Sequence, residues 1–260
     1  MWDPEQYGRF RDERSQPFFD LLGLVQQRPG LRVADLGCGP GELTRELHTR
    51  LQAQETVGVD YSEAMLAKSH AFAGRGVSFE QADLREFAER PETQGAFDLV
   101  LSNAALQWVP DQPDVIAQLT KMLAPNGQLA IQVPANQDHP SHATIREIVA
   151  EPPFREALDN YVRLFSNLTP EAYADLLDRL GYQPQHVRLQ VYVHHLASRA
   201  DVVEWVRGSI LTDYQQRLSP ELFGKFLERY RARLMPQLED RRPFLYTFQR
   251  ILVWGSVGEA

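Results

Sequence analysis

Short apolar runs and amphipathic segments alternate along the first half of the chain. The predicted strands lie at 31–36, 56–60, 77–83, 97–103 and 128–133. Between them apolar side chains recur at helical spacing, as Leu43, Leu47 and Leu51 do after the first strand. Strands that alternate with helices predict a parallel sheet with helices on both faces. Polar side chains end several of the strands, and an open α/β sheet binds its ligand at that carboxyl edge.

Beyond residue 135 the pattern becomes mostly helical. The spacing of apolar side chains predicts helices within 141–180, one helix over 202–214 and another over 223–230. Residues 186–196 alternate in polarity, and this segment and 244–253 each predict a strand. We expect one domain over residues 1–260, made of N-terminal cap helices (1–30), a ligand-binding core (31–135), a helical lid with one strand (136–242) and the last strand (243–254).

The first predicted strand runs directly into a glycine-rich turn. Its order is Gly37-x-Gly39-x-Gly41, and Glu42 stands where a G-x-G-x-x-G dinucleotide motif has its third glycine. A carboxylate at the start of the next helix repels a pyrophosphate, which argues against an NAD-dependent oxidoreductase. Asp35, just upstream, adds negative charge that favours a cationic ligand. The turn therefore predicts either a site for a cofactor without phosphate or only a tight connection.

Two acids stand at the ends of the second and third predicted strands. Asp60 lies about 20 residues beyond the glycines, where the acid of such folds accepts from the ribose hydroxyls. Asp83 is placed to accept from an adenine amino group, and Leu84 with Met65 is placed to sandwich the ring. Either acid alone also suits a helix cap. Both acids together with the glycine turn predict a site for an adenosine-containing cofactor.

These motifs resemble those of the class I S-adenosylmethionine-dependent methyltransferases. The matching stretches are 33–41, 57–62, 82–84 and 123–129. The resemblance implies a Rossmann-like α/β fold with a seven-stranded, mostly parallel sheet, an antiparallel last strand at 244–253, and S-adenosyl-L-methionine as the cofactor. By position it implies that the cofactor contacts Tyr7, Arg14, Gly37, Cys38, Gly39, Asp60, Tyr61, Met65, Asp83, Leu84, Asn103 and Ala104.

A narrower resemblance, to the trans-aconitate methyltransferases, extends over nearly the whole chain. It rests on 7–17, 102–111, 203–206 and the motif Phe248-x-Arg250. It implies an O-methyltransferase that esterifies a carboxylate of a small polycarboxylic acid, trans-aconitate first, with Tyr7 and Arg14 folded over the site.

The chain departs from this narrower family directly after 203–206. Where the family often has Gly-Leu-Arg-Pro, this sequence has Arg207-Gly-Ser-Ile, followed by Leu-Thr-Asp213. Arg207 is the candidate substitute for the missing arginine, whereas the carboxylate of Asp213 would oppose a tricarboxylate. The departure bears on the acceptor and leaves the cofactor motifs intact.

Methyl transfer to a carboxylate requires little catalytic chemistry from the protein. The acceptor is ionised at neutral pH and needs no general base, so the site has to align the reactants, recognise an anion and exclude water. The sequence has no Ser-His-Asp, Cys-His or metal-ligand spacing, and we expect no metal. The candidates for alignment are Arg14, Gln107 and Trp108, and those for acceptor binding are Arg14, His142, Tyr161, Arg207 and Tyr246.

Two alternatives keep the same cofactor site. In one, the protein methylates a secondary-metabolite or carrier-bound acid, or a hydroxyl, enclosed by the aromatic side chains of 223–248. In the other, it binds the cofactor without catalysis, as a sensor or scaffold. A polar, arginine-lined acceptor site favours the polycarboxylate, and turnover excludes the non-catalytic role.

Composition limits the remaining possibilities. The 260 residues carry a net charge of −8, which argues against nucleic acid as a partner. Cys38 is the single cysteine, so an internal disulfide is excluded. The sequence contains no run of 18 apolar residues and no charged-then-apolar leader. We expect a cytoplasmic protein without membrane contact, a monomer or homodimer that acts on a small-molecule acceptor.

Overall fold

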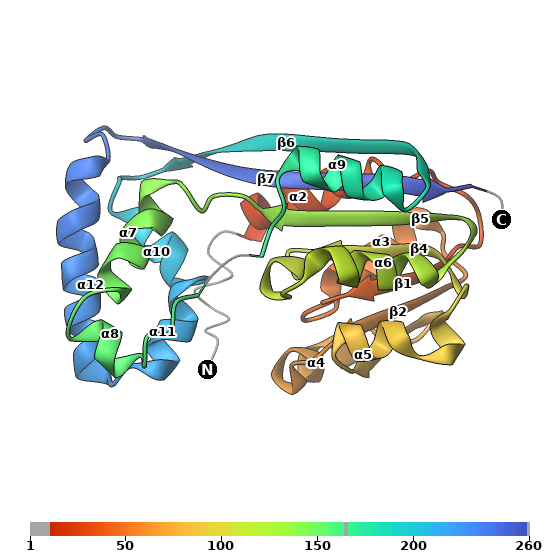
Figure 1. The fold of residues 1–260 in the computed structure, drawn as a ribbon, viewed down its shortest axis with the longest axis horizontal. Helices are drawn as coiled ribbons and strands as arrows, with labels where there is room; N and C mark the ends of the chain where they lie inside the picture. The colour runs from red at the N-terminus through yellow and green to blue at the C-terminus, as the bar shows by residue number, and fades with distance from the viewer. Residues whose placement is uncertain (1–10, 164–165, 259–260) are drawn as a thin grey trace. The chain divides into compact units, whose positions relative to one another are not determined.

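Seven strands form one mixed sheet in the part of the chain that this computed structural model describes (residues 11–163 and 166–258, without the side chains of 11–14; Figure 1). The strand order is β3-β2-β1-β4-β5-β7-β6. The first five strands run parallel, and β7 is antiparallel to β5. The strands are β1 (Arg32–Leu36), β2 (Glu55–Asp60), β3 (Val77–Gln81), β4 (Phe97–Asn103), β5 (Leu123–Pro134), β6 (Tyr182–Leu196) and β7 (Phe244–Val257). The predicted Rossmann-like sheet with an antiparallel last strand is confirmed.

The chain folds as two compact units. Within the described residues, the sheet unit consists of Ser15–Pro134, Ser166–Gln190 and 250–258. The helical unit includes 135–163 and Val191–Gln249. The long strands β6 and β7 contribute residues to both units, as their bounds show (Figure 1).

The sheet unit buries the apolar runs that predicted its strands. In β1 every residue after Arg32 is buried, as expected for a parallel strand covered on both faces. On one face, Phe18 and Leu47 pack in a common core with the strand residues Leu101 and Leu252. The helices of this unit are α2 (Arg11–Leu22, from Ser15 on), α3 (Glu42–Leu51), α4 (Glu63–Ser69), α5 (Leu84–Glu89), α6 (Gln112–Lys121), α9 (Pro170–Arg179) and the 3-10 turns η1 (His70–Phe72), η2 (Pro91–Thr93) and η3 (Leu106–Trp108).

Aromatic rings from several helices form the centre of the helical unit. The ring of Phe226 is fully buried, and its centroid lies 5.4 Å from that of Phe154, 6.1 Å from Tyr214, 6.2 Å from Phe223 and 6.3 Å from Tyr230. Such ring pairs add to the free energy that burial of the area alone provides. The helices of this unit are α7 (Pro140–Val149), α8 (Phe154–Ala157), α10 (Asp201–Arg207), α11 (Leu211–Arg217), α12 (Pro220–Leu234) and the 3-10 turn η4 (Met235–Gln237).

The structure corrects one predicted helix. Residues 202–214 form two helices, α10 and α11, where the sequence predicted one. Gly208 caps α10, and Ser209 Oγ bonds to the carbonyls of Trp205 and Val206 at 3.3 Å each, so a side chain competes with the continuing helical ladder. The apolar positions that predicted one helix are buried nonetheless. The periodicity therefore predicted correctly which side chains are buried, but not that the helix is interrupted between them.

The edge strand β6 turns an apolar stripe outward. Its alternation forms a strand as predicted, but Leu189, Val191 and Val193 are about half exposed. The alternate positions Tyr192 and His194 are the buried ones. The aliphatic face of this strand is therefore not part of the core.

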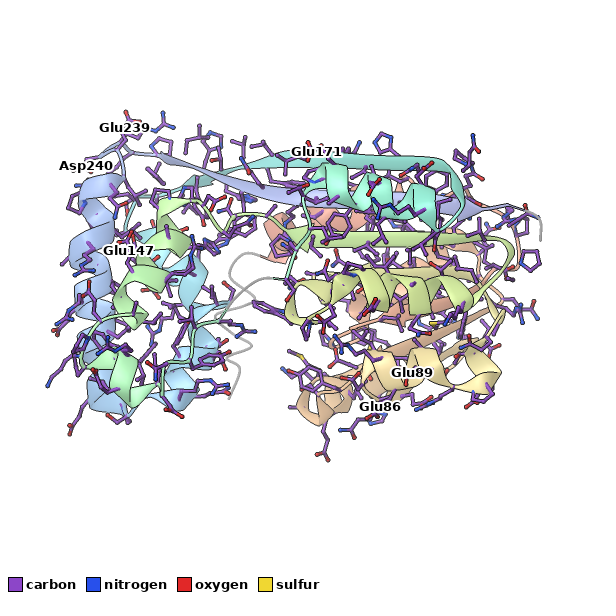
Figure 2. The ribbon with its side chains drawn as sticks, viewed as in Figure 1. Glu86, Glu89, Glu147, Glu171, Glu239 and Asp240 are labelled. Carbon is purple, nitrogen blue, oxygen red and sulfur yellow. The ribbon has the colours of Figure 1, made fainter. Side chains whose placement is uncertain are left out.

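Acidic side chains are spread over several elements. Figure 2 shows Glu86 and Glu89 on α5 and Glu239 and Asp240 ahead of β7, with single labelled acids on α7 and α9. The labelled acids therefore come from elements that lie far apart in the sequence. Among the described residues, the structure contains no helix with the length and apolar character needed to cross a membrane.

Replacing Phe226 by alanine is expected to lower the free energy of unfolding by about 3–5 kcal/mol, because the change leaves a cavity among buried rings. Urea denaturation measures the loss. The exposed Val193 provides a matched control, and Val193→Ala is expected to change stability by less than about 0.5 kcal/mol. Equal stability of the two variants would contradict the core described for the helical unit.

Candidate functional site

Three glycines with positive φ connect β1 to α3. The φ angles are +78° at Gly37, +57° at Gly39 and +82° at Gly41, a region that residues with a Cβ rarely adopt. Gly37 N and Cys38 N donate to Val59 O at 2.8 and 3.0 Å. The turn that leaves β1 therefore lies against the end of β2.

The three glycines differ in their surroundings. A Cβ at Gly37 would lie 2.2 Å from Ala105 Cβ, and one at Gly41 would lie 2.6 Å from the ring of Phe79. A Cβ at Gly39 would meet no atom of the described residues within 4 Å. The packing of the protein itself requires Gly37 and Gly41, whereas Gly39 borders open space where a ligand can approach the backbone.

Asp60 joins the end of β2 to this turn. Its Oδ2 accepts a hydrogen bond from Gly39 N at 2.9 Å, and its Oδ1 accepts one from Ser62 N at 2.9 Å. Each carboxylate oxygen has a further lone pair, so the group can still accept from ligand hydroxyls. The structure thus brings together two residues that the sequence predicted separately.

Asp83 follows β3 and caps α5. Its side chain accepts from Arg85 N at 2.8 Å, which is the helix-cap role that the sequence had left open. Leu84 and Met65, the predicted flanks of the adenine ring, are half-buried, and Tyr61 is strongly exposed. Register pairing of β2 with β3 puts the two acids at the same edge of the sheet.

The end of β4 and the segment after it contain four further predicted residues. Asn103 ends the strand, and Ala104 has a φ of +54°. Gln107 is buried, and its Nε2 donates to Ala104 O at 2.6 Å, whereas Trp108 is exposed. Asn103 Oδ1 and Gln107 Oε1 are buried without a hydrogen-bond partner among the described residues.

Burial sets the protonation of two groups beside the turn. It raises the pKa of Asp35 to about 6, a hydrogen bond from Thr44 Oγ1 at 2.6 Å opposes this, and the charge of Asp60 raises the pKa further. Burial, with the charges of Asp35 and Asp60, also raises the pKa of the Cys38 thiol. The thiol is therefore protonated at neutral pH and is not a nucleophile.

Two acceptor candidates, His142 and Tyr246, meet at Ser141 in the helical unit. Ser141 Oγ lies 2.9 Å from His142 Nδ1, 3.1 Å from Tyr246 Oη and 2.8 Å from His139 Nδ1. Because His139 Nδ1 also accepts from Ser141 N at 3.1 Å, it carries no proton and accepts from Ser141 Oγ. His142 Nδ1 and Tyr246 Oη then donate to Ser141 Oγ.

This network holds neutral imidazoles. Burial lowers the pKa of His142 to about 3, with further lowering by His139 and Arg146, and burial also lowers the pKa of His139. A neutral His142 offers a hydrogen bond and no positive charge. His142 therefore supplies no positive charge for the recognition of an anion.

Tyr161 and Arg207 also have protein partners. The guanidinium of Arg217 lies 3.7 Å from the centroid of the Tyr161 ring. Arg207 forms an ion pair with Glu204 at 3.7 Å. The carboxylate of Asp213, expected to oppose a tricarboxylate, is paired with Arg217 at 3.2 Å. Its negative charge is compensated within the helical unit.

Two predicted residues fall beyond the described side chains. Tyr7 lies outside the described residues, and Arg14 is described only by its helical backbone. Within the described residues no three His, Cys, Asp or Glu side chains are arranged to hold a metal ion.

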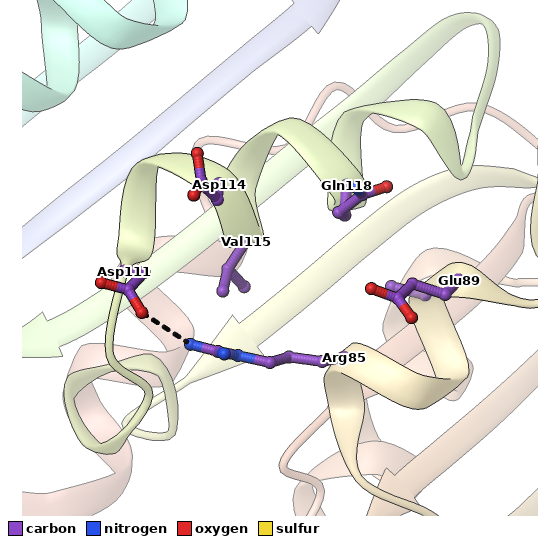
Figure 3. Close-up of a pocket in the computed structure, with 7 residues that line it drawn as sticks. Arg85, Glu89, Asp111, Asp114, Val115 and Gln118 are labelled. Atoms are coloured by element: carbon purple, nitrogen blue, oxygen red, sulfur yellow. Dashed lines mark ion pairs between the residues drawn. The ribbon is translucent and has the colours of Figure 1, made fainter.

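A surface pocket between α5 and α6 contains none of the predicted site residues. Figure 3 shows Arg85 reaching from α5 toward Asp111, with 3.9 Å between Nη2 and Oδ2. The lining residues are Arg85, Ala88, Glu89, Asp111, Asp114, Val115 and Gln118. Three carboxylates beside one guanidinium make this recess unsuitable for a polycarboxylate.

Sequence reasoning assigned no site role to two buried polar residues near Asn103, although Arg250 belongs to the motif Phe248-x-Arg250. Gln132 of β5 is in register with Asn103, and Arg250 of β7 donates from Nη1 to Gln132 Oε1 at 3.1 Å. A polar residue within the apolar segment 128–133 was the available signal for Gln132. Its partner lies 118 positions away, so spacing did not reveal the contact.

Known proteins resemble this chain over nearly its full length. A family model described as a methyltransferase domain matches residues 27–163. The trans-aconitate 2-methyltransferase of Deinococcus radiodurans is 40% identical over 96% of this chain and 96% of its own length. That of Mycobacterium tuberculosis is 35% identical over 100% of this chain and 98% of its own.

Solved structures share the fold at low identity. The YcgJ protein of Bacillus subtilis has a TM-score of 0.60 at 17% identity, over 94% of this chain and 99% of its own. A phosphoethanolamine N-methyltransferase of Haemonchus contortus, solved with S-adenosylhomocysteine, has a TM-score of 0.56 at 16% identity, over 94% of this chain and 53% of its own. At these identities the likeness shows the fold alone.

His142 is expected to lower the free energy of unfolding as the pH drops from about 6.5 toward 3, and Asp35, whose pKa is raised to about 6 in the folded protein, partly offsets this fall. His142 stays neutral in the folded protein but takes up a proton in the unfolded chain, where its pKa is 6.5, so the unfolded state binds more protons in this window. Urea denaturation at several pH values measures the slope. His142→Gln is expected to flatten it, whereas His195→Gln, at an exposed position, retains it. An unchanged slope in His142→Gln would refute the assignment.

Proposed function

Because the chain belongs to the methyltransferase domain family, we propose that it transfers a methyl group from S-adenosyl-L-methionine to a carboxylate of trans-aconitate. The observation that carries the proposal is the glycine turn held by Asp60, in a chain 40% identical to a trans-aconitate 2-methyltransferase. Under this proposal the protein is a cytoplasmic monomer or homodimer that acts on a small molecule.

The residues around the turn suit this cofactor. Gly39 borders open space, and the free lone pairs of Asp60 and Asp83 would accept from ribose hydroxyls and an adenine amino group. The buried carboxyl of Asp35, with its raised pKa, favours a positive charge nearby. When bound, the cofactor supplies an already activated methyl group. The chain has to hold the acceptor in line and exclude water.

The acceptor side needs binding groups more than a base. An acceptor carboxylate is ionised at neutral pH and attacks without losing a proton. Of the residues predicted to bind it, Arg14 and Arg207 would supply positive charge, and Tyr161 and Tyr246 would supply hydroxyl donors. His142 would contribute through its neutral imidazole.

Purified protein is expected to form S-adenosylhomocysteine when given S-adenosyl-L-methionine and trans-aconitate, and to form none with citrate or without an acceptor. Mass spectrometry of the product should show one added methyl group as an ester. Cofactor binding without turnover on trans-aconitate would exclude this acceptor and point to apolar or carrier-bound acids. Absence of cofactor binding would overturn the whole proposal.

Asp60→Ala is expected to weaken S-adenosyl-L-methionine binding by about 1–3 kcal/mol, through loss of charge-assisted hydrogen bonds. Isothermal titration calorimetry measures the affinity. Asp98 is the matched control, because its Oδ2 likewise accepts from a backbone amide, Arg32 N at 2.9 Å, but at the start of β1. Asp98→Ala should reduce stability and leave cofactor affinity unchanged. Equal affinity in Asp60→Ala and wild type would remove Asp60 from the site.

A further inference from the structure

A row of polar side chains crosses one face of the sheet unit where β4 and β5 end. Asn103 is in register with Gln132, Gln132 with Leu252, and Arg250 lies two residues from Leu252 on β7. Register partners and positions two apart share a face of a sheet. Asn103, Gln132 and Arg250 therefore share one face, whose adjoining residues belong to an apolar core.

Gln132 is the buried centre of this row. Its side chain is fully buried, and its Oε1 accepts from Arg250 Nη1 at 3.1 Å. This bond fixes which end of the amide faces the guanidinium, so Nε2 points elsewhere. Gln132 Nε2 is buried and has no hydrogen-bond partner among the described residues. Such a donor is costly to bury unless something accepts from it.

Gln128, four residues earlier on the same face, is an amide with a purely structural role. Its Oε1 accepts from Gln26 N at 2.8 Å and from Trp254 Nε1 at 3.0 Å. Its Nε2 donates to Gln26 O at 2.9 Å. Both ends of the Gln128 amide are thus used by the protein, whereas one end of the Gln132 amide is not.

We propose that Gln132 binds the acceptor, donating from Nε2 to a carboxylate oxygen, with Arg250 holding the amide in that orientation. The inference rests on the proposed function, whose acceptor is a polycarboxylate. A buried amide donor beside a buried guanidinium forms a site for an anion, and a carboxylate can use both charge and hydrogen bonding there.

Asn103 fits the same role. No hydrogen bond to the described residues fixes its amide, whose Oδ1 is buried without a partner. Rotation of the amide by half a turn therefore breaks no bond, and it presents Nδ2 beside Gln132. The row then offers donors from two neighbouring strands to one anionic group.

The test replaces only the proposed donor. Gln132→Glu keeps an oxygen for Arg250 and exchanges the N–H donor for a second oxygen, which repels a carboxylate. We expect the KM for trans-aconitate to rise at least about tenfold, with the Kd for S-adenosyl-L-methionine unchanged. Gln128→Glu is the matched control, because it removes the hydrogen bond donated to Gln26 O and should lower the Tm while leaving the acceptor KM as in wild type.

Two outcomes overturn the inference. If Gln132→Glu lowers the Tm as Gln128→Glu does and leaves the acceptor KM unchanged, Gln132 is structural. If cofactor affinity falls together with acceptor affinity, the row belongs to the cofactor site.

Failure of the proposed function is recognised separately, in the wild type. If wild-type protein shows no turnover on trans-aconitate, that activity fails, and the row is tested by the rise in Tm that trans-aconitate causes in the presence of the cofactor. A rise in wild type that is lost in Gln132→Glu supports the anion site. No rise in wild type, or an equal rise in both, overturns it.

Discussion

The hydrogen bonds that hold the glycine turn against the end of β2 decide where the functional groups of the sheet unit lie. Gly37 N and Cys38 N donate to Val59 O, and Gly39 N donates to the carboxylate of Asp60. These bonds form only because the turn adopts positive φ angles, which cost roughly 1–2 kcal/mol per residue with a side chain. Asp60 therefore holds the turn through one carboxylate oxygen, and a ligand that used its remaining lone pairs would depend on the same side chain.

In both units, burial favours the neutral form of the titratable groups. It raises the pKa values of Asp35 and Cys38 and lowers that of His142, in each case by disfavouring the charged form. Cys38 and His142 are consequently neutral at pH 7, and neither is an activated nucleophile. Such a set suits a reaction in which the acceptor arrives ionised and the donor arrives activated, because the protein then contributes orientation and not proton transfer.

Local patterns predicted the sheet well, since parallel strands are apolar runs and the glycine turn has a fixed place between β1 and α3. They failed where side-chain hydrogen bonds or the position of a strand in the sheet, which apolar periodicity does not show, decided the outcome. The break at Gly208 depends on a serine that bonds back to helix carbonyls, and the outward apolar stripe of β6 depends on its edge position. Ser141 was missed because a serine that joins two histidines and Tyr246 has no sequence signature of its own.

The same limit explains why the different roles of the two amides of β5 could not be predicted from the sequence. Gln128 and Gln132 both interrupt an apolar strand, and alternation alone assigns both to a polar face. Only their partners separate them: Gln128 is fully bonded to Gln26 and Trp254, whereas Gln132 keeps one donor without a partner. A folded protein tolerates an unmet buried donor where a ligand or water meets it. Completeness of hydrogen bonding, more than burial or polarity, therefore distinguishes residues that hold this sheet from residues that serve its site.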